Sequence, residues 1–243
     1  MSRIYVIGLG PGAGETMTYE AAEALGQSDV IIGYKAYTDL VRDKYPGKEI
    51  IESPMRGEIE RCKKCLEIAK SGRSVALICS GDAGVYGMAS PMLETAARED
   101  FDDVVIIPGV TAALSGAAVL GAPIGHDFCV ISLSDLLTPW EMIAKRLEYA
   151  AKADMCIVLY NPASTKRVDH LKRACKIVLS ADPADRWCGY VRNIGREQTA
   201  SKICRLSEMQ NEQVDMFTTV FIGNSHTKNE GGRLITPRGY TLG

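Results

Sequence analysis

Three glycine-containing turns, each directly after an apolar run, carry the residues whose types and spacing could do chemistry. They are the turns at residues 8–14, 80–88 and 108–111. Glycine lets backbone amides approach a ligand closely, and α/β proteins bind ligands at the carboxyl ends of their strands. Asp82 lies in the second turn between Gly81 and Gly84, where its carboxylate could meet a ligand or cap the next helix. The pattern predicts one ligand site built from all three turns.

The common nucleotide-binding patterns fit the first turn poorly. A P-loop needs a lysine after its last glycine, and none is present. A dinucleotide fingerprint is met only loosely, because Pro11 lacks the amide N–H that would face a pyrophosphate. The next apolar run ends in Tyr34 and Lys35 and not in the acid that would hold a ribose. The turn by itself therefore leaves the ligand open, and a glycine turn without a ligand remains an alternative.

Strands and helices must position these turns. Apolar, β-branched runs that alternate with helical periodicity predict an α/β fold, with mostly parallel sheets covered by helices. Gly121, Ala122 and Pro123 mark a boundary, so we expect two α/β domains, residues 1–120 and 121–243. Strands are expected at 4–8, 30–33, 75–79, 104–107, 128–133, 155–159, 188–191 and 217–222, and helices at 19–25, 58–69, 88–98, 111–122, 139–151 and 168–179.

Composition excludes several classes of protein. The 243 residues are 46% hydrophobic and 24% charged, with a net charge of −2, which is ordinary for a globular chain. Mixed charges argue against nucleic acid, no apolar run reaches the roughly 18 residues of a membrane span, and the N-terminus does not resemble a signal peptide. Cys62 and Cys65 have no second pair or nearby histidine, so we expect reduced, structural cysteines and no metal site. His126, His170 and His226 share no ligand spacing and are interpreted as surface or core residues.

The motifs resemble one family over nearly the whole chain. Gly8-x-Gly10-Pro11-Gly12 with Met17-Thr18, Ser80-Gly81-Asp82-x-Gly84 and Pro108-Gly109-Val110-Thr111 are similar to the tetrapyrrole methylases. Residues 33–37, 125–128, 131–140, 159–162, 191–193 and 236–240 look like the subgroup that methylates carbon 17 of precorrin-3B or its cobalt-containing counterpart. Relatives often carry proline where this chain has Ala83, a departure from which we expect little effect.

The resemblance implies S-adenosyl-L-methionine as cofactor, a precorrin-type tetrapyrrole as substrate, an active-site cleft between the domains, and a cytoplasmic homodimer. It implies methylation of carbon 17 with ring contraction, in corrin (cobalamin) biosynthesis. It identifies no catalytic acid or base. The residues it assigns to cofactor binding are Leu9, Gly10, Pro11, Gly12, Asp82, Val85, Tyr86, Thr111, Ala112, Tyr160, Asn161, Arg192 and Thr219. The candidates for substrate binding are Tyr34, Lys35, Ser134, Asp135, Arg196 and Arg238.

Three alternatives stay open at this stage. A methylase of another ring position would share the first three motifs. A nicotinamide oxidoreductase would use the loose dinucleotide fingerprint. A non-catalytic carrier would bind a tetrapyrrole without consuming a cofactor. Whether the substrate contains cobalt is not fixed by the residues, although we favour the cobalt-containing form.

Overall fold

The computed structural model describes residues 2–12, 14–54 and 56–241. The chain divides into two compact units, Met1–Thr111 and Ala112–Gly243. The division that the sequence suggested lies later, after Leu120. The difference arises because helix α5 (Ala112–Leu120) packs on the sheet of the second unit. Its small residues allow this: a Cβ built at Gly116 would lie 2.8 Å from the Phe221 ring.

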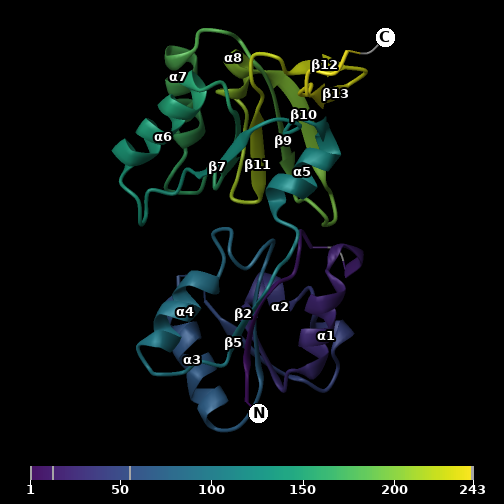
Figure 1. The fold of residues 1–243 in the computed structure, drawn as a ribbon, viewed down its shortest axis with the longest axis vertical. Helices are drawn as coiled ribbons and strands as arrows, with labels where there is room; N and C mark the ends of the chain where they lie inside the picture. Colours follow the sequence, from purple (N-terminus) through teal and green to yellow (C-terminus); the bar gives the residue numbers. More distant parts are fainter. Residues whose placement is uncertain (1, 13, 55, 242–243) are drawn as a thin grey trace. The chain divides into compact units, whose positions relative to one another are not determined.

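The first unit is built on a parallel five-stranded sheet in the order β3-β2-β4-β1-β5 (Figure 1). Parallel pairing agrees with the apolar runs, which are buried on both faces of the sheet. The strands are β1 (Ile4–Gly8), β2 (Val30–Tyr34), β3 (Glu49–Ser53), β4 (Val75–Cys79) and β5 (Val104–Ile107).

Helices cover both faces of this sheet (Figure 1). Successive side chains of a strand point to opposite faces. Ile4 and Val6 therefore pack against α3 and α4, whereas Ile7 packs against α1. Thr18 caps α1 as the sequence predicted, because its Oγ1 accepts a hydrogen bond from Ala21 N at 3.1 Å. The helices are α1 (Tyr19–Gln27), α2 (Lys35–Thr38), α3 (Glu58–Lys70) and α4 (Ala89–Ala97), with short 3₁₀ turns at Gly14–Thr16 and Arg42–Lys44.

The second unit contains a mixed five-stranded sheet in the order β10-β9-β11-β8-β7. Only the β7–β8 pair is parallel in this sheet, so the expectation of mostly parallel strands is wrong for the second unit. The connection from β9 to β10 spans residues 193–199, too short for the helical crossover that a parallel pair needs. The strands are β7 (Phe128–Ser132), β8 (Cys156–Tyr160), β9 (Trp187–Arg192), β10 (Ala200–Arg205) and β11 (Thr218–Ile222).

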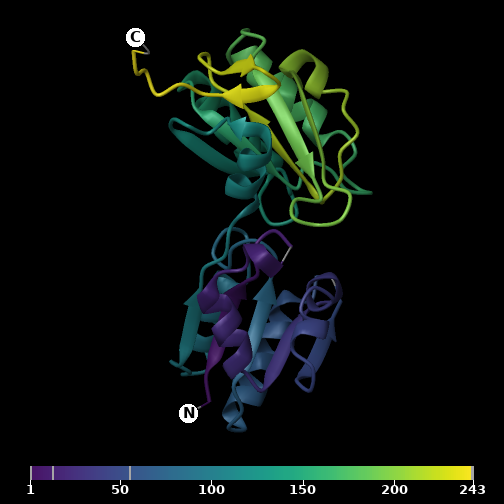
Figure 2. The same cartoon turned by 90° about the vertical axis from the view of Figure 1, so that its right-hand side faces the viewer.

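Helices also cover both faces of the mixed sheet. Helices α6 (Trp140–Lys152), α7 (His170–Ala181) and α8 (Leu206–Met209) pack on one face, and α5 packs on the other. A small sheet of β6 (Gly121–Ala122), β12 (Lys228–Glu230) and β13 (Arg233–Ile235) adds Leu234 to the core under α5. Figure 2 shows β12 and β13 in yellow near the C-terminal end.

The sequence missed strands β3 and β10, and both are edge strands. An edge strand needs no continuous apolar run, because part of it faces water. Accordingly, β3 begins with exposed Glu49, and β10 begins with three exposed residues. The sequence also predicted a helix as far as Ala122, but Gly121 and Ala122 pair with β13 instead.

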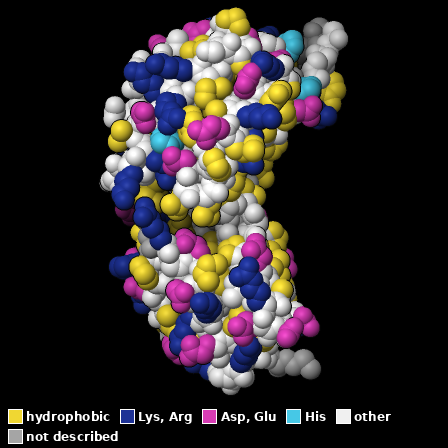
Figure 3. Space-filling view, turned by 90° about the vertical axis from the view of Figure 1, so that its left-hand side faces the viewer, with side chains coloured by type: hydrophobic (Ala, Val, Ile, Leu, Met, Phe, Trp, Pro, Cys, Tyr) yellow, Lys and Arg dark blue, Asp and Glu magenta, His cyan; other side chains and the backbone are white. Residues whose placement is uncertain are grey.

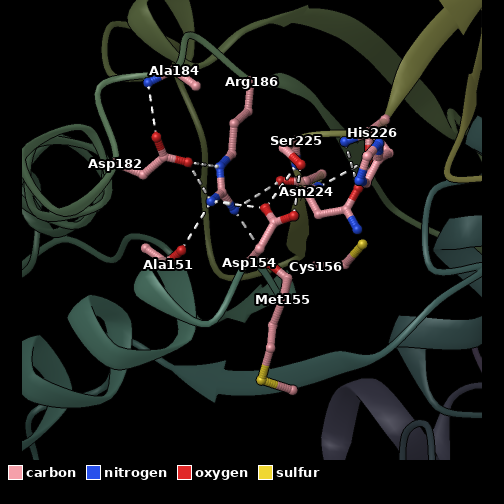
Figure 4. Close-up of polar contacts among 12 residues, drawn as sticks. Ala151, Asp154, Met155, Cys156, Asp182, Ala184, Arg186, Asn224, Ser225 and His226 are labelled. Atoms are coloured by element: carbon pink, nitrogen blue, oxygen red, sulfur yellow. Dashed lines mark hydrogen bonds and ion pairs between the residues drawn. The ribbon is translucent and has the colours of Figure 1, made fainter.

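A buried arginine joins the ends of three elements of the second unit (Figure 4). The Arg186 side chain is 1% exposed and forms ion pairs with Asp182 at 2.6 Å and Asp154 at 3.1 Å. Its guanidinium also donates to the carbonyls of Ala151 and Gly223, at 2.9 and 3.3 Å. The ends of α6, α7 and β11 are therefore fixed around one charged group.

Two observations bear on membrane and nucleic-acid contact. Among the described residues, no helix has both the length and the apolar character to cross a membrane. On the face shown in Figure 3, basic and acidic side chains are interspersed. This face therefore lacks the continuous basic surface that nucleic acids require.

Candidate functional site

The first two glycine turns meet at the carboxyl edge of the first sheet. They follow the neighbouring strands β1 and β4. From there the chain continues to β2 on one side and to β5 on the other, which is the point where open α/β sheets bind ligands. Gly10 N donates to Gly81 O at 3.0 Å, and Gly81 N donates to Gly10 O at 2.7 Å.

Glycine is required here because the turns touch backbone to backbone. A Cβ built at Gly109 would lie 2.2 Å from Gly81 O and 2.5 Å from Gly8 O. A Cβ at Gly8 would lie 2.6 Å from the same Gly81 oxygen. The three turns that the sequence singled out therefore form one contiguous cluster, and their glycines serve this packing.

Asp82 ties two of the turns together. Its Oδ1 accepts from Gly84 N at 2.8 Å and from Val85 N at 3.0 Å, and its Oδ2 accepts from Gly109 N at 3.0 Å. It does not cap a helix, because α4 starts at Ala89 with Met88 in the N-cap position. A carboxylate has about four acceptor positions, so these three amides leave capacity for a further donor.

The remaining predicted residues of the first unit occupy different environments. Leu9 is 2% exposed and packs in the core beneath α1, so only its backbone can reach a ligand. Pro11 is buried, and Gly12, Val85 and Thr111 are half-buried. Tyr86 is exposed and has a φ of 54°, a conformation that costs energy outside glycine and often marks functional sites.

Tyr34 is the last residue of β2 and Lys35 is the first residue of α2, away from the glycine turns in the chain. Lys35 Nζ forms ion pairs with Asp39 at 2.9 Å and with Glu52 at 3.9 Å, and these pairs raise its pKa. The Tyr34 ring meets Tyr37 edge-on at 5.4 Å. The structure therefore gives Lys35 acidic partners within its own unit, which weakens the case for a substrate contact.

In the second unit, Tyr160 and Asn161 lie where β8 ends. Tyr160 Oη accepts from Ala113 N at 2.6 Å, which places it beside Ala112 at the start of α5. Asn161 has a φ of 53°, and its Nδ2 donates to Ser132 Oγ at 3.0 Å. The structure thus brings together the residues predicted from α5 and β8, and adds Ser132, which the sequence did not single out.

The other predicted residues of the second unit are more dispersed. Arg192 is exposed at the end of β9, in register with Thr218, while Thr219, the second residue of β11, is only 5% exposed. The guanidinium of Arg196 lies 5.4 Å from the Phe217 ring centre. Arg238 lies beyond β13, over the Tyr240 ring at 5.6 Å.

Ser134 and Asp135 are bound by side chains at the start of α7. Arg167 Nη1 donates to Ser134 Oγ at 3.1 Å, and His170 Nε2 lies 3.0 Å from Asp135 Oδ2. The hydrogen bond to His170 lowers the pKa of the Asp135 carboxyl below its usual value. Sequence reasoning missed Arg167 and interpreted His170 as an isolated residue, because no spacing rule links them to residue 135.

Cys62 and Cys65 are part of the core under α3. Both are buried, and burial raises the pKa of the Cys62 thiol to about 11 and that of Cys65 further. Thiols of this kind are poor nucleophiles and poor metal ligands. No cluster of three or more histidine, cysteine or acidic residues suited to a metal occurs within the described ranges.

A cavity of about 330 Å³ opens between α7 and the segment after α8. Asp169, Lys172 and Glu212 lie in its wall. None of the predicted site residues lines it, so it is separate from the clusters described above.

Known proteins resemble this chain over its whole length. Residues 3–210 match the family described as Tetrapyrrole (Corrin/Porphyrin) Methylases. The chain is 47% identical to a "Probable cobalt-factor III C(17)-methyltransferase" of Salmonella typhimurium, covering 98% of this chain and 99% of that one. It is 38% identical to a "Precorrin-3B C(17)-methyltransferase" of a Sinorhizobium species, covering 98% and 96%. The chain belongs to the tetrapyrrole methylase family.

Solved structures agree with this membership. The crystal structure of the methyltransferase CobJ superposes with a TM-score of 0.92 at 35% identity, covering 98% of this chain and all of that one. A uroporphyrin-III C-methyltransferase of Thermus thermophilus, solved with S-adenosylhomocysteine, shares the fold with a TM-score of 0.71 at 20% identity, covering 91% and 97%. The α/β fold expected from the family resemblance is confirmed, apart from the strand directions in the second sheet.

Proposed function

We propose that this family member is an S-adenosylmethionine-dependent methyltransferase that methylates carbon 17 of a precorrin-type macrocycle, with ring contraction, in corrin synthesis. The observation that carries the proposal is the end-to-end 47% identity with a relative named for this reaction. The relative named for cobalt-factor III is closer than the one named for precorrin-3B, at 47% against 38% identity. We therefore propose the cobalt-containing macrocycle as the preferred substrate.

The residues present fit the proposed cofactor. S-adenosylmethionine supplies a methyl group on a sulfonium, so its transfer needs neither a protein nucleophile nor a further activating group. The spare acceptor capacity of Asp82 suits the ammonium of the cofactor. The amide of Asn161 and the hydroxyl of Thr111 suit its ribose and base. Variants at these residues should therefore weaken cofactor binding.

The task of the protein is then to bind and align the reactants and to exclude water. The fixed backbone of the glycine turns gives the cofactor a preorganised surface, since Gly10 and Gly81 are already hydrogen-bonded to each other. Arg196 is proposed to meet peripheral carboxylates of the macrocycle, because arginine binds carboxylates in a bidentate manner. The homodimer and the cytoplasmic location rest on the family resemblance alone.

Product analysis tests the reaction. The protein is incubated with cobalt-factor III, and separately with precorrin-3B, together with methyl-labelled S-adenosylmethionine. We expect one label on carbon 17 by mass spectrometry and NMR, with faster turnover of the cobalt form. Label on another ring carbon would show that a different position is methylated, while methyl transfer to a tetrapyrrole would still hold. No label with either macrocycle would refute the proposal.

Cofactor binding and assembly are measured separately. S-adenosylhomocysteine at a hundredfold excess over its dissociation constant should stabilise the folded protein by about 2.7 kcal/mol. An unfolding midpoint that does not move at saturation would remove the cofactor from the proposal. Light scattering that gives a monomer mass at micromolar concentrations would remove the homodimer.

A further inference from the structure

The segment Ser134–Pro139, between β7 and α6, is anchored from the start of α7. Arg167 holds Ser134 at 3.1 Å, and His170 holds Asp135 at 3.0 Å. His170 is 5% exposed, so it supports Asp135 from inside the unit, while the Asp135 side chain remains 38% exposed. We call Ser134–Pro139 the anchored segment.

The far end of the anchored segment is fixed as well. Trp140, the first residue of α6, meets the His170 ring edge-on at 4.9 Å. The guanidinium of Arg173 lies 3.9 Å from the centre of the Trp140 indole, close enough for a cation–π contact. His170 thus contacts Asp135 near one end of the segment and Trp140 just beyond the other, so one buried side chain helps to fix both ends.

Between these anchors, two leucines point to solvent. Leu136 is 61% exposed and Leu137 is 93% exposed. A single exposed leucine needs no explanation, but here Ser134 and Asp135 anchor the segment and two successive leucines face outward. An ordinary surface loop has the opposite distribution, with its polar side chains in water and its apolar side chains packed inward.

The anchored segment lies next to residues already proposed for the cofactor. It begins directly after Ser132 and Leu133, and Ser132 Oγ accepts from Asn161. Leu133 N also donates to Tyr160 O at 2.9 Å. The two leucines therefore belong to the same edge of the second sheet as Tyr160 and Asn161.

We propose that Leu136 and Leu137 contact the apolar face of the tetrapyrrole, and that His170 is a positioning residue acting through Asp135. A conjugated macrocycle offers a flat apolar face with carboxylates at its rim, so two rigidly presented leucines match its centre. The inference rests on the proposed function. It changes the role predicted for Ser134 and Asp135 from contacting the substrate to holding the segment that does.

The leucines are tested by replacing each with serine. Cobalt-factor III is titrated by absorbance at saturating S-adenosylhomocysteine. We expect Leu136→Ser and Leu137→Ser each to raise the dissociation constant of the macrocycle about tenfold, since each loses the burial of a large apolar side chain. The dissociation constant of S-adenosylhomocysteine and the unfolding midpoint should not change. Tyr149→Ser, at a side chain 59% exposed on α6, is the matched control and should bind the macrocycle normally.

Several outcomes overturn the inference. Unchanged macrocycle binding in both leucine variants would remove them from the substrate site. A smaller particle mass by light scattering in these variants would assign the leucines to contact with a second copy of the chain. Wild-type protein that binds cobalt-factor III without methylating it would refute the proposed reaction, and the comparison of variants would still test the leucines. Wild-type protein that binds neither cobalt-factor III nor precorrin-3B would overturn both.

His170 is tested by a pair of variants. His170→Leu removes the donor to Asp135 and should raise the macrocycle dissociation constant as the leucine variants do, with cofactor affinity unchanged. His170→Gln keeps an amide donor and should restore much of the macrocycle affinity. If both variants only lower the unfolding midpoint, and bind the macrocycle normally well below it, then His170 is structural and not a positioning residue.

Discussion

Replacing Asp82 with asparagine tests whether its carboxylate holds the second and third glycine turns together. The side chain keeps its size, and Oδ1 can still accept from Gly84 N and Val85 N. The other atom becomes an NH₂ group, which then faces the N–H of Gly109 where an oxygen accepted it at 3.0 Å. Two donors meet, so the link from the second turn to the third is lost in the protein without ligand.

The expected cost follows from the number and kind of bonds. One charge-assisted hydrogen bond disappears and two lose their charge, and bonds of this kind contribute roughly 1.5–3 kcal/mol each. Because all three amides lie in turns that are not fully buried, water can replace part of the loss. We expect the first unit to lose about 2 kcal/mol of stability, and the affinity for S-adenosylhomocysteine to fall tenfold or more.

Two measurements check this expectation. Urea unfolding of the ligand-free protein gives the stability, and amide hydrogen exchange at Gly109 reports the broken link directly. Asp102→Asn is the control, because it makes the same chemical change at an exposed residue just before β5 and should stay within about 0.5 kcal/mol of wild type. An Asp82→Asn protein with normal stability and normal Gly109 exchange would show that the hydrogen bonds described above do not hold the turns.

Two further predictions concern the interior. Arg186→Met should destabilise the second unit by about 3 kcal/mol, because it leaves Asp182 and Asp154 without their buried partner. The hydrogen bond from Arg186 lowers the pKa of Asp182, so the stability that this pair contributes is complete near neutral pH and is lost as the pH falls through that pKa. The difference between the two proteins should therefore be smaller in acid than at neutral pH, with a remainder from the lost hydrogen bonds to the carbonyls of Ala151 and Gly223. An equal difference in acid and at neutral pH would contradict this. Burial raises the pKa of Cys62 to about 11 and also that of Cys65, so iodoacetamide should label neither until denaturant is added, and fast labelling of the native protein would show that α3 is not packed as described.

Most of the central strands were predicted correctly because a strand that is buried on both faces has an unbroken run of apolar residues. Strands β1, β4 and β8 are covered on both faces and appear as unbroken apolar runs. Whether a strand runs parallel or antiparallel to its neighbour has a weaker effect on the sequence pattern. For β9 and β11, the only signal was the absence of a long helical pattern between them, which argued against a parallel crossover.

The sequence predicted those parts of the candidate site that are formed by residues adjacent in the chain. It did not predict the parts formed by residues that only folding brings together. Gly10, Gly81 and Asp82 were found because a glycine turn after a strand is a local pattern. The partners of Asp135 and Asn161, which are His170 and Ser132, come from other elements and share no spacing with them. Side chains that hydrogen-bond to candidate site residues from other elements are therefore the hardest to find from the sequence.

Motif residues that also hold the turns together are ambiguous probes of cofactor binding. Asp82 and Gly81 hold the turns together before any ligand arrives, so a loss of affinity at either can come from the fold alone. Val85 offers a cleaner test, because its contact with Asp82 is made by the backbone N–H at 3.0 Å and survives truncation of the side chain. If Val85→Ala weakens cofactor binding and leaves the unfolding midpoint and Gly109 exchange unchanged, the loss must come from contact with the ligand. An effect of this kind, and not the loss seen at Asp82, would establish that the glycine turns form the binding surface.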